Sequence, residues 1–159
     1  MKLPKRRRKE CKTDYKLRLG LLKYGKPRLV IRKTNKYIIA QIVTSEEAQD
    51  RVVCGITSKK LTESGWPKEK KGSLKNLAAA YLTGFIIGKM AMKKEIDNLI
   101  VDIGLYRSIP KSRIYSVVKG AKDAGVNVLC DESVFPSGEQ ITRNGEFEDI
   151  INKIKEKIQ

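Results

Sequence analysis

Lysine and arginine are the residues of this sequence whose types and spacing point most directly to chemistry. The 159 residues include 34 Lys and Arg against 18 Asp and Glu, a formal net charge of +16. Fifteen of these cations lie between Met1 and Lys36, where Glu10 and Asp14 are the acidic residues. The rest of the chain has a net charge of +3. This local excess of positive charge predicts a polyanionic partner that binds the N-terminal part of the chain.

The segment from Met1 to Lys12 is rich in cations and has almost no apolar side chain to bury. We therefore expect a basic arm without regular structure until it meets its partner. Such an arm can contact nucleic acid, but it can also serve as a nuclear-import signal or only raise solubility. No apolar stretch of the signal-peptide type follows it. The longest apolar run, from Leu77 to Gly88, is too short to span a bilayer.

Catalytic and metal-binding chemistry finds little support in the sequence. It has no histidine, and Cys11, Cys54 and Cys130 lack the paired spacing of zinc sites. Because these cysteines are odd in number and scattered, they also do not suggest a disulfide framework, and we expect a reducing compartment. Phosphate-binding glycine-rich loops and a serine-nucleophile elbow are absent as well. A metal-dependent nuclease is the one enzymatic alternative, because Asp102 and Asp131 follow neighbouring predicted strands and could hold magnesium together. The leading strands supply no further carboxylate, so we expect no enzyme, no cofactor and no metal.

Residues 27–43 have the pattern of a β-hairpin, in which two aliphatic, β-branched runs flank a polar break at Thr34-Asn35. With these two residues as the loop, Arg28 pairs with Gln41. One face of the hairpin is then wholly apolar and must be covered. The other face combines aliphatic side chains with Arg28, Arg32, Tyr37 and Gln41. Guanidinium and phenol groups beside apolar carbon suit contact with RNA, although they are also common on a solvated sheet face.

Two further elements surround the hairpin. A helix is predicted over residues 14–24, with Thr13 as its cap and an apolar stripe formed by Leu17, Leu21 and Tyr24. A third strand is expected over residues 51–57, with its core face formed by Val52, Cys54 and Ile56. An irregular connector over 58–73 then carries a cluster of lysines and Trp66. This tryptophan either packs as a core anchor or joins the lysines in a second RNA contact.

The period of the hydrophobic pattern then changes. A buried helix is predicted from its cap Asn76 to about Lys93, and its small residues at four-residue spacing predict a close approach to the sheet (Ala80, Gly84 and Gly88). A strand over 98–103, a helix capped by Ser112 and a strand over 126–130 form a parallel βαβ unit. The tail ends in an amphipathic helix that we expect to dock on the body of the protein.

These elements predict an α/β fold: a mixed five-stranded sheet, with three antiparallel strands and then a βαβ unit, and helices packed against it. We divide the chain into a basic arm over 1–12, an α/β RNA-binding domain over 13–130, and a C-terminal loop and amphipathic helix over 131–159.

Several long motifs resemble one known family, the eighteenth protein of the large ribosomal subunit, with the archaeal form as the best match. The eukaryotic relative is the large-subunit protein five. The matching motifs are Arg6-Arg7-Arg8, Lys12-Thr13-Asp14-Tyr15, Gly25-Lys26-Pro27-Arg28-Leu29-Val30, Asn35-Lys36-Tyr37-Ile38-Ile39-Ala40-Gln41-Ile42, Ala79-Ala80-Tyr81-Leu82-Thr83-Gly84, Asp102-Ile103-Gly104-Leu105 and Glu132-Ser133-Val134-Phe135-Pro136. The resemblance covers roughly residues 5–147.

The resemblance implies a ribonuclease-H-like sheet and a structural protein of the cytoplasmic ribosome. It implies binding to 5S rRNA, attachment of that RNA to 23S rRNA at the central protuberance, and contact with neighbouring large-subunit proteins, without a membrane. Carried over to this sequence, the RNA-binding residues are Lys5, Arg6, Arg7, Arg8, Lys9, Lys12, Arg18, Arg28, Arg32, Lys33, Asn35, Lys36, Tyr37, Lys59, Lys60, Arg107 and Arg113.

Overall fold

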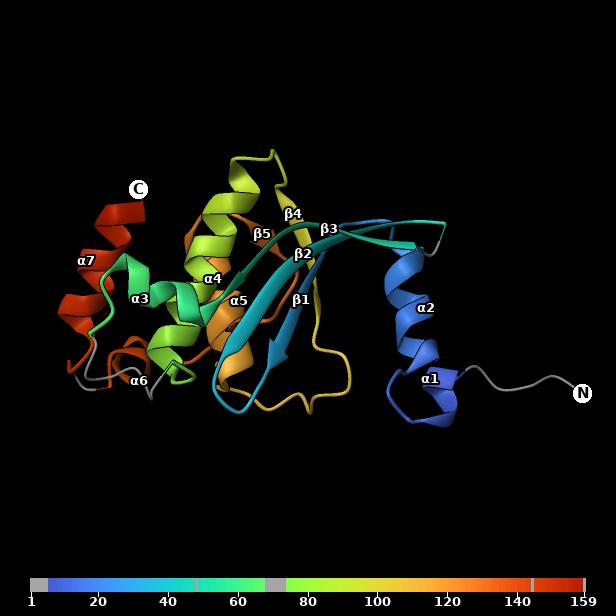
Figure 1. The fold of residues 1–159 in the computed structure, drawn as a ribbon, viewed down its shortest axis with the longest axis horizontal. Helices are drawn as coiled ribbons and strands as arrows, with labels where there is room; N and C mark the ends of the chain where they lie inside the picture. The colour runs from blue at the N-terminus through green and yellow to red at the C-terminus, as the bar shows by residue number, and fades with distance from the viewer. Residues whose placement is uncertain (1–5, 48, 68–73, 144, 159) are drawn as a thin grey trace, which may run out of the picture.

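A five-stranded mixed sheet forms the centre of the protein (Figure 1). The computed structural model describes residues 6–47, 49–67, 74–143 and 145–158. The strand order is β3-β2-β1-β4-β5, with β1 (Arg28–Lys33), β2 (Ile38–Glu46), β3 (Gln49–Thr57), β4 (Asn98–Asp102) and β5 (Asn127–Val128). The first three strands are antiparallel, whereas β4 runs parallel to β1 and β5 runs parallel to β4. This topology confirms the predicted mixed sheet of the ribonuclease-H-like kind.

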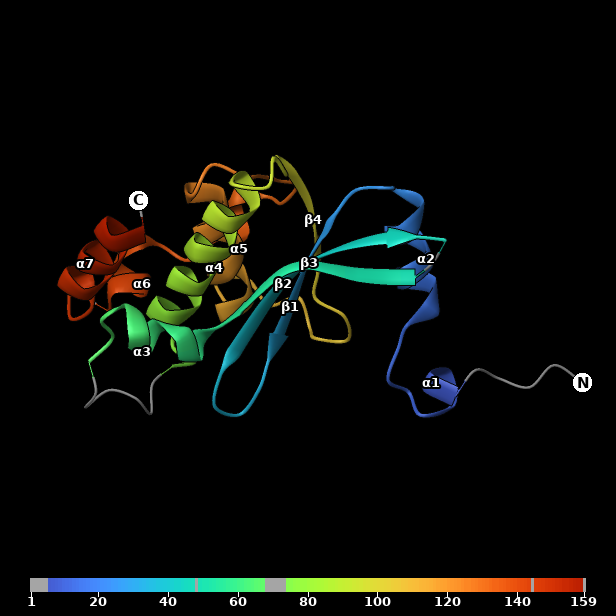
Figure 2. The ribbon, with the colours of Figure 1, turned by 45° about the horizontal axis from the view of Figure 1, so that its top comes forward.

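The helices lie in several groups around this sheet (Figures 1 and 2). The long helices α4 (Leu77–Met92) and α5 (Arg113–Asp123) cover one face of the sheet. The short elements η1 (Ser58–Lys60) and α3 (Leu61–Ser64) follow β3, and η3 (Glu132–Val134), α6 (Gly138–Thr142) and α7 (Glu148–Ile158) form the tail. The N-terminal helices α1 (Arg6–Lys9) and α2 (Tyr15–Lys23) lie at the end of the molecule opposite α7.

The β1–β2 hairpin has the predicted faces, but its register differs by two residues. Val30 pairs with Gln41, and Arg28 pairs with Val43 rather than Gln41. The predicted Thr34-Asn35 loop is wrong because the Thr34 hydroxyl and main chain both bond to Tyr37, which makes residues 35 and 36 the tip of the turn. Since a shift of two residues preserves the alternation of side chains, the predicted apolar face is still the buried one. It consists of Leu29, Ile31, Ile38, Ala40 and Ile42.

Strand β3 contains a β-bulge that the hydrophobic pattern did not reveal. Ile42 pairs with Cys54, but its neighbour Val43 pairs with Val52, so Val53 is an extra residue in the ladder. A bulge reverses the alternation of side chains on one side of it. Cys54 and Ile56 therefore face the core as predicted, whereas the core position predicted for Val52 is wrong and its side chain is exposed.

Helices α4 and α5 pack against each other at glycines. An ideal Cβ on Gly84 would lie 2.0 Å from the carbonyl oxygen of Val117, and one on Gly120 would lie 2.1 Å from that of Tyr81. The predicted cap Asn76 starts α4, and its side chain accepts a hydrogen bond from the Ala79 N–H at 2.7 Å. The small-residue edge of α4 therefore permits a close helix–helix contact with α5, and the close approach to the sheet that we predicted for it is wrong.

The C-terminal tail docks on the body of the protein, as predicted. Helices α6 and α7 pack on α4, and Ile151 and Ile154 of α7 are buried. The Phe147 ring stacks on Trp66 with a centroid separation of 5.6 Å and an interplanar angle of 20°. Trp66 is therefore a core anchor, one of the two roles considered for it. The lysines at 68, 70 and 71 that the second RNA contact would need lie outside the described residues.

The N-terminal segment is more regular than predicted but just as exposed. Residues 6–9 form the single turn α1 where an irregular arm was expected, and Arg6 lies 3.8 Å from Glu10 one turn further on. Helix α2 is capped by Asp14, not Thr13, because the Asp14 carboxylate accepts from two N–H groups of the first turn. No residue of α2 is buried: of the predicted apolar stripe, Leu21 is partly buried and Leu17 and Tyr24 are exposed.

Candidate nucleic-acid interface

The turn of the β1–β2 hairpin and the loop that follows β4 lie together at one end of the sheet (Figure 1). The Tyr106 hydroxyl of that loop donates to the Lys33 carbonyl at 2.6 Å and accepts from the Lys33 N–H at 3.2 Å. On the other side of the hairpin, the Ile38 N–H donates to the Ser58 hydroxyl at 3.1 Å, which holds η1 against β2. Three segments that are distant in sequence are thus fixed to one another at this end.

The exposed predicted RNA-binding residues fall into two groups. At this end of the sheet, which we call the turn surface, the exposed residues are Lys33, Asn35, Lys36, Lys59, Lys60, Arg107 and Arg113. The described part of the basic arm contributes Arg6, Arg7, Arg8, Lys9 and Lys12, all of them exposed. Tyr37 is partly buried, and Lys5 lies outside the described residues. Exposed lysine and arginine side chains can neutralise phosphates without first breaking a buried contact.

Arg28 belongs to neither group, because its side chain is only 3% exposed. Its guanidinium donates to Asp102 at 2.9 Å, to Asp50 at 2.7 Å and to the Ser45 hydroxyl at 2.9 Å. Burial of an ion pair is tolerated when further hydrogen bonds satisfy its polar atoms, as they do at this site. Arg28 thus joins β1 to β2, β3 and β4, and it offers no accessible guanidinium to RNA, contrary to the sequence-based expectation.

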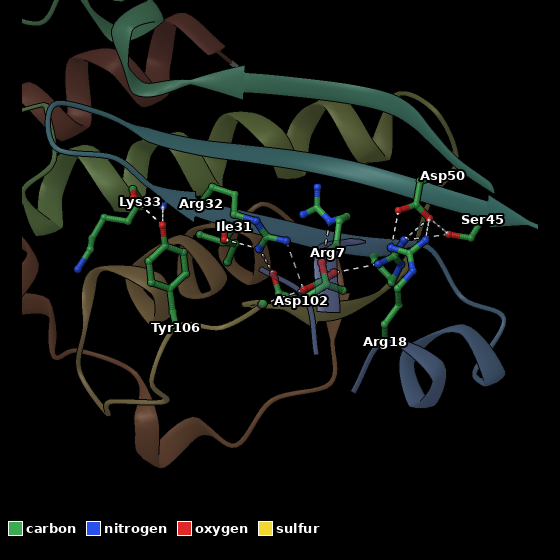
Figure 3. Close-up of polar contacts among 12 residues, drawn as sticks. Arg7, Arg18, Ile31, Arg32, Lys33, Ser45, Asp50, Asp102 and Tyr106 are labelled. Carbon is green, nitrogen blue, oxygen red and sulfur yellow. Dashed lines mark hydrogen bonds and ion pairs between the residues drawn. The ribbon is translucent and has the colours of Figure 1, made fainter. Parts of the chain in front are cut away.

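Arg18 connects helix α2 to the same cluster (Figure 3). Its two terminal nitrogens donate to the two carboxylate oxygens of Asp50 at 2.9 and 3.0 Å, a bidentate pair. Burial raises the pKa of Asp50, but hydrogen bonds from Arg18, Ser45 and Arg28 outweigh it and lower the pKa to about 2. The hydrogen bond to Asp50 in turn raises the pKa of Arg18. Asp50 is therefore an ionised link between the N-terminal helix and the sheet.

Arg32, near the end of β1, is intermediate in exposure between the buried Arg28 and the exposed cations. Its guanidinium donates to the main-chain carbonyls of Ile31 and Asp102 at 2.9 and 3.2 Å, and it lies 3.7 Å from the Asp102 carboxylate. Gly104 leaves the room for this side chain, because a Cβ at that position would lie 3.1 Å from the guanidinium. Gly104 also has a φ of +60°, a conformation that L side chains rarely adopt. The partly exposed side of Arg32 faces a groove.

This groove has a volume of about 1040 Å³ and separates the N-terminal segment from the sheet and the loop after β4. We call it the α2 groove. Its lining includes Arg7, Lys12, Leu17, Leu19, Arg32 and Leu105. Neither the groove nor the role of Asp50 was found by sequence reasoning, because Arg18 and Asp50 are 32 residues apart and Arg28 and Asp102 are 74 residues apart. No short-range spacing could indicate these pairs.

The nuclease alternative has no suitable carboxylate arrangement in the described part of the chain. The Asp102 carboxylate is paired with Arg28, and the exposed Asp131 accepts from the Ser133 N–H at 3.0 Å as a local cap. Among the described residues, no three His, Cys, Asp or Glu side chains come together in a group that could hold a metal ion.

The fold and the charged surfaces define a basic α/β protein of ribonuclease-H-like topology that is suited to bind a polyanion. A family model described as "Ribosomal large subunit proteins 60S L5, and 50S L18" matches residues 1–99. The chain therefore belongs to this family of large-subunit ribosomal proteins, whose members are structural proteins and not enzymes. In the described residues, no helix has the length and apolar character needed to cross a bilayer.

Three curated relatives carry the name "Large ribosomal subunit protein uL18". The protein from Methanothermobacter thermautotrophicus is 44% identical over 140 residues, which cover 88% of this chain and 71% of the relative. The protein from Korarchaeum cryptofilum is 43% identical over 136 residues, covering 86% and 68% of the two chains. The protein from Halobacterium salinarum is 44% identical over 133 residues, covering 84% and 70%. The resemblance seen in the sequence motifs is thereby confirmed.

Proposed function

We propose that this protein binds 5S rRNA in the large subunit of the cytoplasmic ribosome and helps to attach it to 23S rRNA at the central protuberance. It makes further contacts there with neighbouring ribosomal proteins. The observation that carries this proposal is the separation of two kinds of cation. Arg28 and Arg18 are bound by Asp50, whereas the cations of the arm and the turn surface are exposed.

The exposed cations suit RNA better than a small anion. They extend over the arm, the hairpin turn, η1 and the loop after β4, and so present many separate phosphate contacts instead of one converging site. Phosphate contacts supply affinity and position, while shape and unpaired bases supply specificity for a folded RNA. A folded ribosomal RNA offers phosphates for affinity as well as a defined shape and unpaired bases for specificity. Family membership supports this assignment, because the matched relatives are named as large-subunit proteins.

A competition experiment tests the proposal. Labelled 5S rRNA is bound to the full chain at physiological salt, and unlabelled 5S rRNA, tRNA or duplex DNA is added as competitor. We expect 5S rRNA to compete at concentrations about 1,000-fold or more below those of the other two, since specific binding is typically 10³–10⁷ tighter than non-specific binding. Equal competition by all three would instead identify a general nucleic-acid-binding module and would contradict the proposal.

A further inference from the structure

Helix α2 is held beside the sheet by charge and leaves Leu17 and Leu19 exposed, whereas Leu21 and Leu22 are partly buried. Its nine residues include none that is buried, and the side chain of Leu19 is 55% exposed. The bidentate pair between Arg18 and Asp50 connects it to the sheet. A helix of this length is only marginally stable alone, so its apolar side chains favour a partner that covers them. The exposed Leu17 and Leu19 border the α2 groove.

The opposite wall of the groove is apolar as well. Leu105, in the loop after β4, is 58% exposed and lines the groove together with Tyr106. Tyr106 is held in place by its two hydrogen bonds to Lys33. The groove thus has leucine side chains on both walls, one set on α2 and one on a loop fixed to the hairpin.

The charges in the groove favour an anionic occupant. Three carboxylates line it: Asp50 and Asp102 already bind guanidinium groups of the protein, and Asp14 caps α2 by accepting from two main-chain N–H groups. Arg7 donates to the Thr13 hydroxyl at 2.8 Å, and no carboxylate in the described chain forms an ion pair with it. Lys12 lies 2.9 Å from Glu10 on the exposed arm and also lines the groove. Cations that can still be reached therefore lie beside exposed apolar side chains.

We propose that the α2 groove holds unpaired nucleotides of the RNA partner, an inference that rests on the proposed function. An unpaired base presents an apolar face that can lie against leucine or tyrosine, and its phosphate can reach a neighbouring arginine or lysine. In a duplex the base faces are stacked on one another and cannot use the leucine walls. A volume of about 1040 Å³ is at the upper end of the roughly 300–1,000 Å³ typical of single-ligand pockets, so it has room for more than one nucleotide.

The test uses two groove variants and one matched control in the full chain. Leu19→Ser and Leu105→Ser each remove one leucine from one of the two walls, and Leu129→Ser removes a leucine that is also 55% exposed but does not line the groove. Binding is measured to 5S rRNA, to an oligonucleotide of ten uridines and to a ten-base-pair RNA duplex. We expect each groove variant to bind 5S rRNA and the oligonucleotide roughly five- to tenfold more weakly, with unchanged duplex binding and an unchanged control.

The salt dependence of 5S rRNA binding provides a second readout. Leucine variants should keep the slope of log K against log salt, since they remove no phosphate contact, whereas Arg7→Ala should reduce it by about one. If the unmodified chain binds 5S rRNA but Leu19→Ser and Leu105→Ser bind it equally well, the groove inference is wrong and the proposed function stands. Equal losses of binding to the duplex and to the single strand would also overturn it. If the unmodified chain does not bind 5S rRNA, both proposals fail.

Discussion

Arg28 and Asp102 are 74 residues apart in the sequence, yet their side chains form a buried ion pair with a nitrogen–oxygen distance of 2.9 Å. Arg28 lies at the start of β1 and Asp102 at the end of β4, the two central strands that run parallel. The pair joins the antiparallel half of the sheet to the βαβ half. An arginine that sequence reasoning assigns to RNA thus acts within the protein itself.

Replacing Arg28 with methionine should destabilise the fold by about 3–5 kcal/mol, because the buried Asp102 carboxylate loses its closest ion-pair partner. The measurement is the free energy of unfolding in urea at pH 7. Arg113→Met serves as the control, since Arg113 is exposed on α5 and should change stability by no more than about 0.5 kcal/mol. Equal stabilities of the two variants would show that the buried pair contributes nothing.

Asp50 should make the stability of the protein depend on acid pH. Its pKa falls from the ordinary value of 3.8 to about 2 in the folded state. A group with a lowered folded-state pKa stabilises the fold above its unfolded pKa, and this contribution is lost as the pH falls from about 4 to about 2. Asp50→Asn should therefore reduce the decline in unfolding free energy over that pH window. The exposed Asp97→Asn is the control, and an identical pH profile for both variants would rule out this role.

Gly84→Ala should destabilise the contact between α4 and α5, because its Cβ would lie 2.0 Å from the Val117 carbonyl oxygen. Forcing these helices apart should cost about 1–3 kcal/mol, as overpacking of a core typically does. Thermal unfolding compares this variant with Gly138→Ala, at a glycine in α6 with no atom within 4 Å of the added Cβ. The prediction fails if both substitutions leave the midpoint unchanged.

Deleting residues 1–12 should weaken RNA binding while leaving the fold intact. The described part of this arm is wholly exposed, so its removal should change the free energy of unfolding by no more than about 0.5 kcal/mol. Binding should weaken and become less salt-dependent, because several phosphate contacts are lost. A deletion that abolished cooperative unfolding, or one that left the affinity for 5S rRNA unchanged, would contradict this account.

Helices and strands could be predicted from the sequence where the spacing of apolar residues or a capping residue identifies them. The apolar alternation in β1 and β2 identified the buried face, and Asn76 marked the start of α4. The hairpin register could not be obtained in the same way, because Thr34 bonds to Tyr37 through both its side chain and its main chain. The bulge at Val53 likewise depends on pairing between strands, which a single strand's pattern does not contain.

The positive charge of the candidate site could be predicted from the sequence. Which cations are exposed and which form ion pairs within the protein could not. The cations of the arm and the turn surface are exposed, as a local charge excess predicts. The sequence offers no way to tell Arg28 from Lys33, because the difference lies in Asp102, a partner brought close by parallel pairing of β1 with β4. The bidentate pair between Asp50 and Arg18 likewise depends on the position of α2 beside the sheet, which no local pattern contains.

The most direct test of the central claim is the affinity of the full chain for 5S rRNA measured between 50 and 300 mM salt. If about eight exposed cations each neutralise a phosphate, log K should fall against log salt with a slope near −6 to −7. This account predicts a slope in that range for the unmodified chain. A slope near zero would contradict it, because the exposed cations of the arm and the turn surface would then not contact the RNA.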